Sequence, residues 1–553
     1  MRLNTFLPRE PVWACLTVLA VLLLVLFLVW PIFSMLSLSL IDQNGEVSFS
    51  GYQSFFQSRG YRRILSNTLT LGLAVTLCSL LLGGLLALAV ARWKFALARW
   101  VMILPLVTLV IPDVVVAASW ILVLGRQGVV NMWLEPLGVQ LPTLYSWWGL
   151  VFVMTLNNYV YAFVAILVGL KSMDQSLELA ANSLGYPMRS VLTRVTYPMM
   201  VPSVLSGALL VFMHAISDFG IPAILGARTP VLSVAAYNAF VSEMGTTPQM
   251  QTTLASVLVF LGLVMLFAQK WIVDRRQVQM ESGRSPPLVV LKGMSGMLVG
   301  GLILIIMTLS LLPALVVLVT AVTPSSGPVL QYGGFTTAHL EYALMRAPAP
   351  LYNSLFLATI ATLVGTAFSI VVGYLIVKKG SVASQFLESM VMLPLSIAGT
   401  VLGIALIHAF NSPPILLAGT WVIMALAYFL RRVPISVRAA MGPLHNLRDS
   451  IEEAARSLGV SPFKSFFKVI LPVIAPSVAA SAVLMWVTTL SELSATIVLY
   501  YGGMNTMPIE IFQQVDSGRL AQASAYSTIL LLTIFIPLWI ANRVFRLNIG
   551  NVA

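Results

Sequence analysis

The sequence predicts an all-α polytopic membrane protein built from two homologous halves, with about twelve transmembrane helices in total. Three observations support this fold class. The 553 residues are 59% hydrophobic and only 9% charged, whereas about a quarter of the residues of a soluble globular protein are charged. Apolar stretches long enough to cross a bilayer recur along the whole chain. One polar stretch of the first half occurs again in the second half, in the same order and spacing.

The first half, residues 1–273, contains six predicted spans. The apolar run from about Val12 to Leu40 is too long for the core of a signal peptide and is not followed by a small-residue cleavage site. We therefore interpret it as a first span that is retained. The other five predicted spans lie at about 64–90, 101–124, 147–170, 201–225 and 253–273.

Residues 274–293 separate the halves. This stretch, DRRQVQMESGRSPPLVVLKG, is charged and contains Gly283 and the pair Pro286-Pro287. It cannot span lipid and is predicted to be a cytoplasmic linker. The second half, residues 294–553, contains six further predicted spans, at about 294–321, 351–377, 386–409, 415–432, 474–500 and 525–542.

The repeated stretch runs from Ile451 to Pro472 (IEEAARSLGVSPFKSFFKVILP) and, 274 residues earlier, from Leu177 to Pro198 (LELAANSLGYPMRSVLTRVTYP). We call these stretches the second and first repeat loops. So many identities without a gap, at a lag of half the chain, predict that the two halves are homologous.

Each repeat loop is predicted to be a surface helix, a tight corner and a second short helix. In the second loop Gly459 permits the left-handed backbone that ends a helix, and Pro462 suits the start of the next. The first loop has the same plan, with Asp174, Gly185 and Pro187. A rigid surface helix of this kind can transmit the movement of a partner. The alternative is a re-entry turn that was duplicated with the rest of the chain.

The basic residues predict the orientation. If the N-terminus is cytoplasmic, both repeat loops, the linker and the C-terminus are cytoplasmic too. Most of the 31 lysines and arginines then fall on the cytoplasmic side, including Arg431 and Arg432 at the cytoplasmic end of the tenth span. This excess is typical of membrane proteins, so the net charge of +12 needs no nucleic-acid partner.

The second repeat loop resembles the "EAA" loop of the permease subunits of binding-protein-dependent ABC importers. The matching residues are Glu453, Ala454, Ala455, Gly459, Ile470, Leu471 and Pro472. The first loop matches through Ala180, Ala181 and Gly185, but Leu179 stands in the place of the motif glutamate and Glu178 comes one position early. The resemblance implies that the two loops, at about 171–200 and 433–472, couple the chain to an ATPase, and that the two docking sites are unequal.

The same resemblance implies a type I ABC importer permease fold, two copies of a cytoplasmic ABC ATPase, a periplasmic solute-binding protein and a bacterial inner membrane. The stretches SDFGIPAILG and SELSATIVLY, each after a repeat loop, make the chain most similar to ferric-iron permeases. Thiamine, phosphonate, polyamine and sugar phosphate are alternative substrates. The sequence has no Gly-x-x-x-x-Gly-Lys-Ser/Thr phosphate loop. We therefore expect a transport subunit rather than an enzyme, with no cofactor of its own and with ATP used by the partner.

Three acids lie within predicted spans: Asp113, Asp218 and Glu492. A charge at the centre of a bilayer costs about 2.5–3.5 kcal/mol on insertion scales, so such a residue normally faces a cavity or a partner. We treat all three as candidates to line the pathway, where carboxylates would stabilise a multivalent cation, although no metal site can be assigned. In the alternative interpretation Asp218 and Glu492 cap or brace the halves, and Asp113 satisfies amides beside Pro112.

Two other classes of protein are alternatives to an importer. An ion-coupled secondary transporter also uses internal repeats and would use the same three acids as ion sites. An intramembrane enzyme would need a nucleophile with a base or a set of metal ligands, and neither is apparent. Cys15 and Cys78 lie in apolar runs and fit small buried hydrophobic residues. His214 and His408 are expected to form hydrogen bonds between helices rather than to bind a ligand.

Overall fold

The computed structural model describes residues 6–8, 10–42, 44–94, 98–173, 175–242, 247–275, 293–326, 329–331 and 333–545. These residues are almost entirely helical, apart from a short antiparallel pairing of β1 (Ser325–Ser326) with β2 (Val329–Leu330). Most of the predicted linker 274–293, and Asp174 of the first repeat loop, lie outside the described residues.

Ten helical segments in the described part of the chain are long and apolar enough to cross a membrane. They are α1–η1–α2 (Pro11–Leu24, Val25–Val29, Trp30–Leu38), α4 (Arg59–Arg92), α6–α7–η2 (Asp113–Leu124, Val129–Leu134, Glu135–Leu137), α8 (Trp147–Ser172), η3–α11 (Leu192–Thr196, Tyr197–Ser217), α14 (Pro248–Arg275), α15 (Gly293–Thr320), α17 (Ala349–Lys378), α22–η6–α23 (Pro462–Ser465, Phe466–Ile470, Leu471–Leu490) and α26 (Leu520–Phe545). This confirms the predicted all-α membrane fold.

Two predicted spans are bent or broken at prolines. The span predicted at 386–409 consists of α18 (Val382–Met392), η5 (Leu393–Ser396) and α19 (Gly399–Phe410), with an angle of 113° between its two parts. The span predicted at 101–124 is likewise divided into α5 (Ala98–Thr108) and α6. Pro394 lies in η5, just before the bend, and Pro112 lies directly before α6. Proline lacks the amide hydrogen that a continuous helix needs.

The tenth predicted span requires a correction. The sequence places it at 415–432, but α20 runs from Trp421 to Asn446 and continues past Arg431 and Arg432. These two arginines therefore lie inside a helix and not in a cytoplasmic connection. Both arginines form ion pairs with the buried Glu492, which compensates one of their two charges. The other basic residues on the predicted cytoplasmic side still outnumber those on the opposite side.

The structure repeats at the same offset as the sequence. The series α8, α9 (Gln175–Ser183), α10 (Met188–Val191), η3 and α11 corresponds to α20, α21 (Asp449–Ser457), α22, η6 and α23. Each element of the first series begins 274 residues before its counterpart. The two halves are therefore homologous, as predicted.

The first span of each half packs against the other half. Helices α1 and α2 contact α17, α18 and α19 of the second half, where the Trp13 ring lies 4.7 Å from the Tyr374 ring. Helix α15 contacts α5 and α6 of the first half, where Ser119 Oγ donates a hydrogen bond of 2.9 Å to the carbonyl of Pro313. This exchange makes the two halves depend on each other for packing.

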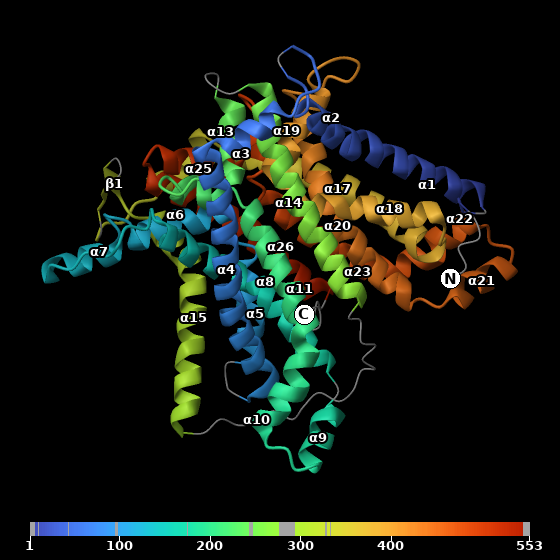
Figure 1. The fold of residues 1–553 in the computed structure, drawn as a ribbon, viewed down its shortest axis with the longest axis horizontal. Helices are drawn as coiled ribbons and strands as arrows, with labels where there is room; N and C mark the ends of the chain where they lie inside the picture. The colour runs from blue at the N-terminus through green and yellow to red at the C-terminus, as the bar shows by residue number, and fades with distance from the viewer. Residues whose placement is uncertain are drawn as a thin grey trace.

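The molecule has two arms that diverge from a common end (Figure 1). Helices α4 and α15 run downward in the view, with α9 and α10 at their lower end, whereas α1, α17 and α18 run to the right toward α21 and α22. Short helices connect the spans: α3 (Ser50–Gln57), α12 (Gly220–Leu225), α13 (Leu232–Val241), α16–η4 (Ala338–Glu341, Tyr342–Arg346), α24 (Thr496–Leu499) and α25 (Met507–Asp516). The two repeat loops thus lie at the far ends of different arms.

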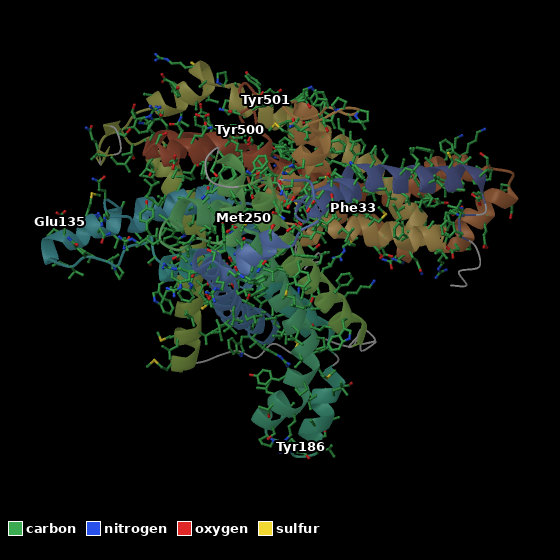
Figure 2. The ribbon with its side chains drawn as sticks, turned by 45° about the horizontal axis from the view of Figure 1, so that its top comes forward. Phe33, Glu135, Tyr186, Met250, Tyr500 and Tyr501 are labelled. Carbon is green, nitrogen blue, oxygen red and sulfur yellow. The ribbon has the colours of Figure 1, made fainter. Side chains whose placement is uncertain are left out.

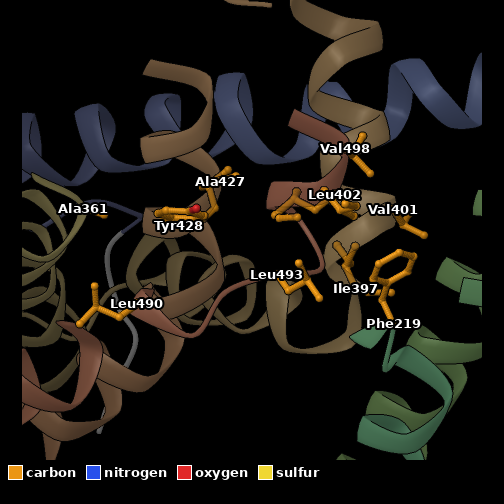
Figure 3. Close-up of a cluster of buried hydrophobic side chains, with 14 of the residues drawn as sticks. Phe219, Ala361, Ile397, Val401, Leu402, Ala427, Tyr428, Leu490, Leu493 and Val498 are labelled. Carbon is orange, nitrogen blue, oxygen red and sulfur yellow. The ribbon is translucent and has the colours of Figure 1, made fainter. Parts of the chain in front are cut away.

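A buried apolar cluster joins the halves where the arms meet. Phe219 of the first half, which is fully buried, approaches Ile397, Val401 and Leu493 of the second half (Figure 3). Between membrane helices, such contacts are stabilised mainly by close van der Waals packing of the side chains. This packing holds the polar residues next to it in place.

Candidate functional site

A cavity of about 370 Å³ lies between the two halves. Its walls come from the α5–α6 break, α8 and α11 of the first half, and from η5, α20 and α23 of the second half. The structure brings together all three acids that the sequence suggested. The polar lining includes Thr108, Asp113, Asn157, Tyr161, His214, Ser217, Asp218, Arg431, Arg432, Thr488, Ser491, Glu492 and Ser494.

Glu492 is the centre of an ion-pair cluster on the second-half wall. Its Oε2 lies 2.7 Å from Arg432 Nη2 and 3.1 Å from Arg431 Nε. Its Oε1 accepts a hydrogen bond of 3.2 Å from the amide of Ala495, at the turn before α24. The residue is only 4% exposed, and these are contacts of the capping and bracing kind. Arg432 also donates to the carbonyl of Thr488 at 2.8 Å.

Asp218 occupies the corresponding position of the first half but has different neighbours. It is 5% exposed, and no described residue makes a hydrogen bond of ordinary length and angle to its carboxylate oxygens. The amides of Gly220 and Ile221, at the start of α12, face the carboxylate and partly offset its burial. Asp218 therefore lacks the cationic partners that Glu492 has.

Asp113 is the most accessible of the three acids. It begins α6, and its Oδ1 accepts a hydrogen bond of 2.7 Å from Asn157 Nδ2. No lysine or arginine of the described residues forms an ion pair with it. Nearby, the Tyr161 hydroxyl lies 2.9 Å from His214 Nε2, which confirms the expected interhelical hydrogen bond of this histidine. His408 instead packs edge-on against Phe240, and its Nε2 has no hydrogen-bond partner among the described residues.

Sequence reasoning missed Asn157, Tyr161 and the arginine pair as parts of this site. The signal was present in the repeat, because Asn157-Asn158 and Arg431-Arg432 are equivalent at the offset of 274. Two adjacent positions thus carry amides in one half and guanidinium groups in the other. The predicted end of the tenth span at residue 432 concealed this difference.

The two repeat loops have the predicted helix, corner and helix. The corner glycines have left-handed backbones, with φ of 82° at Gly185 and 79° at Gly459. Leu184 and Leu458, one residue before each glycine, are 78% and 85% exposed. Tyr186 marks the tip of the first loop, at the opposite end of the molecule from Tyr500 and Tyr501 (Figure 2).

The motif positions differ in exposure between the loops. In the first loop Leu179, Ala180 and Gly185 are exposed and Ala181 is half-buried. In the second loop Glu453, Ala454 and Gly459 are exposed, whereas Ala455 is buried. The surface available to a partner therefore carries a leucine in one loop where it carries a glutamate in the other.

Glu178 anchors the first loop to the end of α4. Both of its oxygens accept hydrogen bonds from Arg92, one of them at 2.6 Å from Nη1, and Thr196 Oγ1 donates to Oε1 at 2.7 Å. The hydrogen bonds from Arg92 hold the pKa of Glu178 below its usual range, and burial of the carboxylate opposes this effect.

Glu452 makes the equivalent anchor in the second half. It accepts hydrogen bonds of 2.9 Å from Lys379, at the end of α17, and from the Tyr374 hydroxyl. Lys379 also contacts Glu10 of the first half at 3.3 Å. Glu178 and Glu452 occupy equivalent positions at the offset of 274. Glu178 is therefore the equivalent of Glu452 in the repeat, and it is not a shifted copy of the motif residue Glu453.

Comparison with known proteins agrees with a chain made of two homologous halves. The sequence model of the family described as "Binding-protein-dependent transport system inner membrane component" matches residues 79–278 and again residues 365–547. The ferric transport system permease protein of Actinobacillus pleuropneumoniae is 27% identical over 529 residues, which cover 92% of this chain and 75% of that protein.

Two further relatives span the chain to different extents. A probable ABC transporter permease protein of Sinorhizobium fredii is 25% identical over 567 residues and covers 98% of both chains. The molybdate/tungstate transport system permease protein of Pyrococcus furiosus is 30% identical over 191 residues, which are 34% of this chain and 75% of that protein. The family domain occurs twice and covers most of each half, so this chain is a multi-pass membrane protein that belongs to the binding-protein-dependent transport system inner membrane components, the permeases of ABC importers.

Proposed function

We propose that this chain forms the complete translocation pathway of an ATP-driven importer for ferric iron. The ferric permease of A. pleuropneumoniae supports this substrate, because its similarity extends over 92% of the chain and includes both halves. A single chain with two homologous halves needs no second permease subunit. The cavity between the arms is the proposed route, with Asp113, Asp218 and Glu492 on its walls.

The proposed partners occupy opposite ends of the molecule. Two copies of a cytoplasmic ABC ATPase dock on the two repeat loops, through Leu179, Ala180, Ala181 and Gly185 in the first and Glu453, Ala454, Ala455 and Gly459 in the second. A periplasmic solute-binding protein docks on the opposite end, near α13 and α25. In this arrangement the loops and both termini are cytoplasmic, as the excess of basic residues on that side supports.

An oxyanion is the alternative substrate, because the molybdate/tungstate permease is also similar to this chain. Thiamine, phosphonate, polyamine and sugar phosphate remain alternatives from the sequence resemblance. The accessible carboxylate of Asp113 favours a cation over an oxyanion. Both arginines already contact Glu492, whereas Asp113 and Asp218 have no cationic partner among the described residues.

The test is ATPase stimulation in lipid nanodiscs. The permease is assembled with its candidate ATPase, and binding proteins loaded with ferric iron, molybdate, thiamine or a phosphonate are added in turn. We expect ferric-loaded binding protein to raise ATP turnover and the others to leave it at the basal rate. Stimulation by a different loaded protein would reassign the substrate, and no association with any ATPase would reject the importer.

A further inference from the structure

The two walls of the cavity have diverged in charge at equivalent positions. Asp113 and Gly399 each begin the helix after a break, α6 and α19, and they are related by the offset of 286 that also relates Asn67 to Asn353. A Cβ at Gly399 would lie 1.9 Å from Arg431 Nη1, so the arginine occupies the space that a side chain would need. The first half has an acid at this position and an amide opposite it. The second half has a glycine there and a guanidinium opposite it.

On the second-half wall of the cavity, the positive and negative side chains are paired with each other. Arg431 and Arg432 both contact Glu492, which leaves one positive charge in excess. The first-half wall carries Asp113 and Asp218, and neither forms an ion pair with a described residue. Of these two acids Asp113 is the accessible one, and an unpaired carboxylate on one wall of a low-dielectric cavity attracts a cation to that wall.

We infer that this cavity contains a transient binding site for a hydrated multivalent cation on its first-half wall, with Asp113 as the charged ligand and Asn157 and Tyr161 as neutral oxygen ligands. The inference rests on the proposed function, because it gives the imported cation a stopping point within the pathway. Asp218 also belongs to the cavity lining, but its oxygens are buried, so it is not one of the proposed ligands.

The geometry of α8 supports these ligands. Asn157 and Tyr161 are four residues apart, so they share the face of the helix that lines the cavity. Asn157 donates to Asp113 through Nδ2, which leaves its carbonyl oxygen for a ligand. The Tyr161 hydroxyl contacts His214 Nε2, so its proton can point to the imidazole while its oxygen faces a cation. Hard cations prefer such oxygen ligands.

The site is open and hydrated. The described residues contain no group of three His, Cys, Asp or Glu side chains placed to hold a metal ion. A cavity of about 370 Å³ has room for on the order of ten water molecules, which would complete the coordination of a cation. Weak binding suits a pathway, because an ion has to leave the site as readily as it enters.

Terbium luminescence tests the site without the ATPase or the binding protein. Tb³⁺ is a hard trivalent cation whose emission is sensitised by nearby aromatic rings, and Tyr161 lines the cavity. Purified permease in nanodiscs is titrated with Tb³⁺. We expect saturable emission in the wild type and an affinity at least tenfold lower in Asp113→Asn. Tyr161→Phe retains the packing of the ring, and we expect it to weaken binding several-fold.

The matched control is Asp516→Asn, which removes an exposed carboxylate that is not part of the cavity lining and should leave the emission unchanged. Wild-type Tb³⁺ affinity in folded Asp113→Asn protein and in Tyr161→Phe protein would overturn the inference. Saturable binding of molybdate that is lost in Arg431→Gln would also overturn it, in favour of an anion site. If Tb³⁺ binds as expected while ferric-loaded binding protein fails to stimulate the ATPase, the site stands and the proposed substrate fails.

Discussion

Replacing Glu178 by glutamine tests how the first repeat loop is connected to the transmembrane helices. The substitution keeps the shape of the side chain and removes the charge that pairs with Arg92. The two side chains are 7% and 13% exposed, so solvent screens the pair only weakly. Removing one partner of a buried ion pair typically costs about 3–5 kcal/mol. Because glutamine still accepts one hydrogen bond and Thr196 remains in reach, we expect a loss of about 2–3 kcal/mol in the stability of the docked loop.

Such a loss corresponds to a roughly 30- to 150-fold increase in the population of the undocked loop, since about 1.4 kcal/mol is a factor of ten. Hydrogen exchange in nanodiscs measures it directly. We expect the amides of α9 to exchange at least 30-fold faster in Glu178→Gln, while those of α21 keep their wild-type rate. In the assembled importer, uptake should fall while ATP turnover continues, because the loop no longer moves with α4.

The equivalent substitution Glu452→Gln should reproduce the effect in α21. The control is Glu453→Gln, because the Glu453 side chain is exposed and its loss should leave exchange in both loops unchanged. If the amides of α9 in Glu178→Gln exchange within twofold of the wild-type rate and uptake is normal, Glu178 does not anchor the first loop.

Four further predictions follow from the loops and the cavity. Gly459→Ala places a side chain on a backbone with φ of 79°, which costs about 1–2 kcal/mol, and we expect a several-fold weaker affinity for the ATPase in a titration of the complex. Glu453→Leu should weaken ATPase binding more than Leu179→Ala does in the same titration, since the motif position carries an exposed carboxylate in the second loop and a leucine in the first; equal effects would argue against unequal docking. The pKa of Glu178 is lowered, so its contribution to loop stability is complete above its usual pKa and is lost as the pH falls through the lowered value. The mobility of a spin label on α9 should therefore stay constant from about pH 8 to about pH 5 and rise below about pH 4. Gly399→Ala would place a Cβ 1.9 Å from a guanidinium nitrogen, and we expect a lower thermal midpoint from the displaced ion pair, by a cost of about 1–3 kcal/mol.

The repeat predicted the fold well because it aligns the two halves residue by residue. The offset of 274 alone locates both loops, both corner glycines and the equivalence of Asp218 with Glu492. Hydropathy located the spans because each apolar stretch must be long enough to cross the bilayer. The exchange of α1 and α15 between the halves was not predictable, since hydropathy does not say which neighbour a span packs against.

The cavity was harder to predict from the sequence. The three acids stand out because charges are rare in apolar stretches. The role of Glu492 depends on Arg431 and Arg432, which hydropathy assigns to a loop because three arginines in one stretch of α20 lower its apolar score. Asn157 and Tyr161 are neutral, so only the folded structure shows that Asn157 contacts Asp113 and that Tyr161 lines the same cavity.

Iron uptake into proteoliposomes tests the central claim most directly. The permease is reconstituted with its ATPase, and ferric-loaded binding protein is supplied outside. We predict uptake that requires ATP, the ATPase and the binding protein together, and none on a proton or sodium gradient alone. Uptake driven by an ion gradient in the absence of the ATPase would contradict the account and identify an ion-coupled secondary transporter.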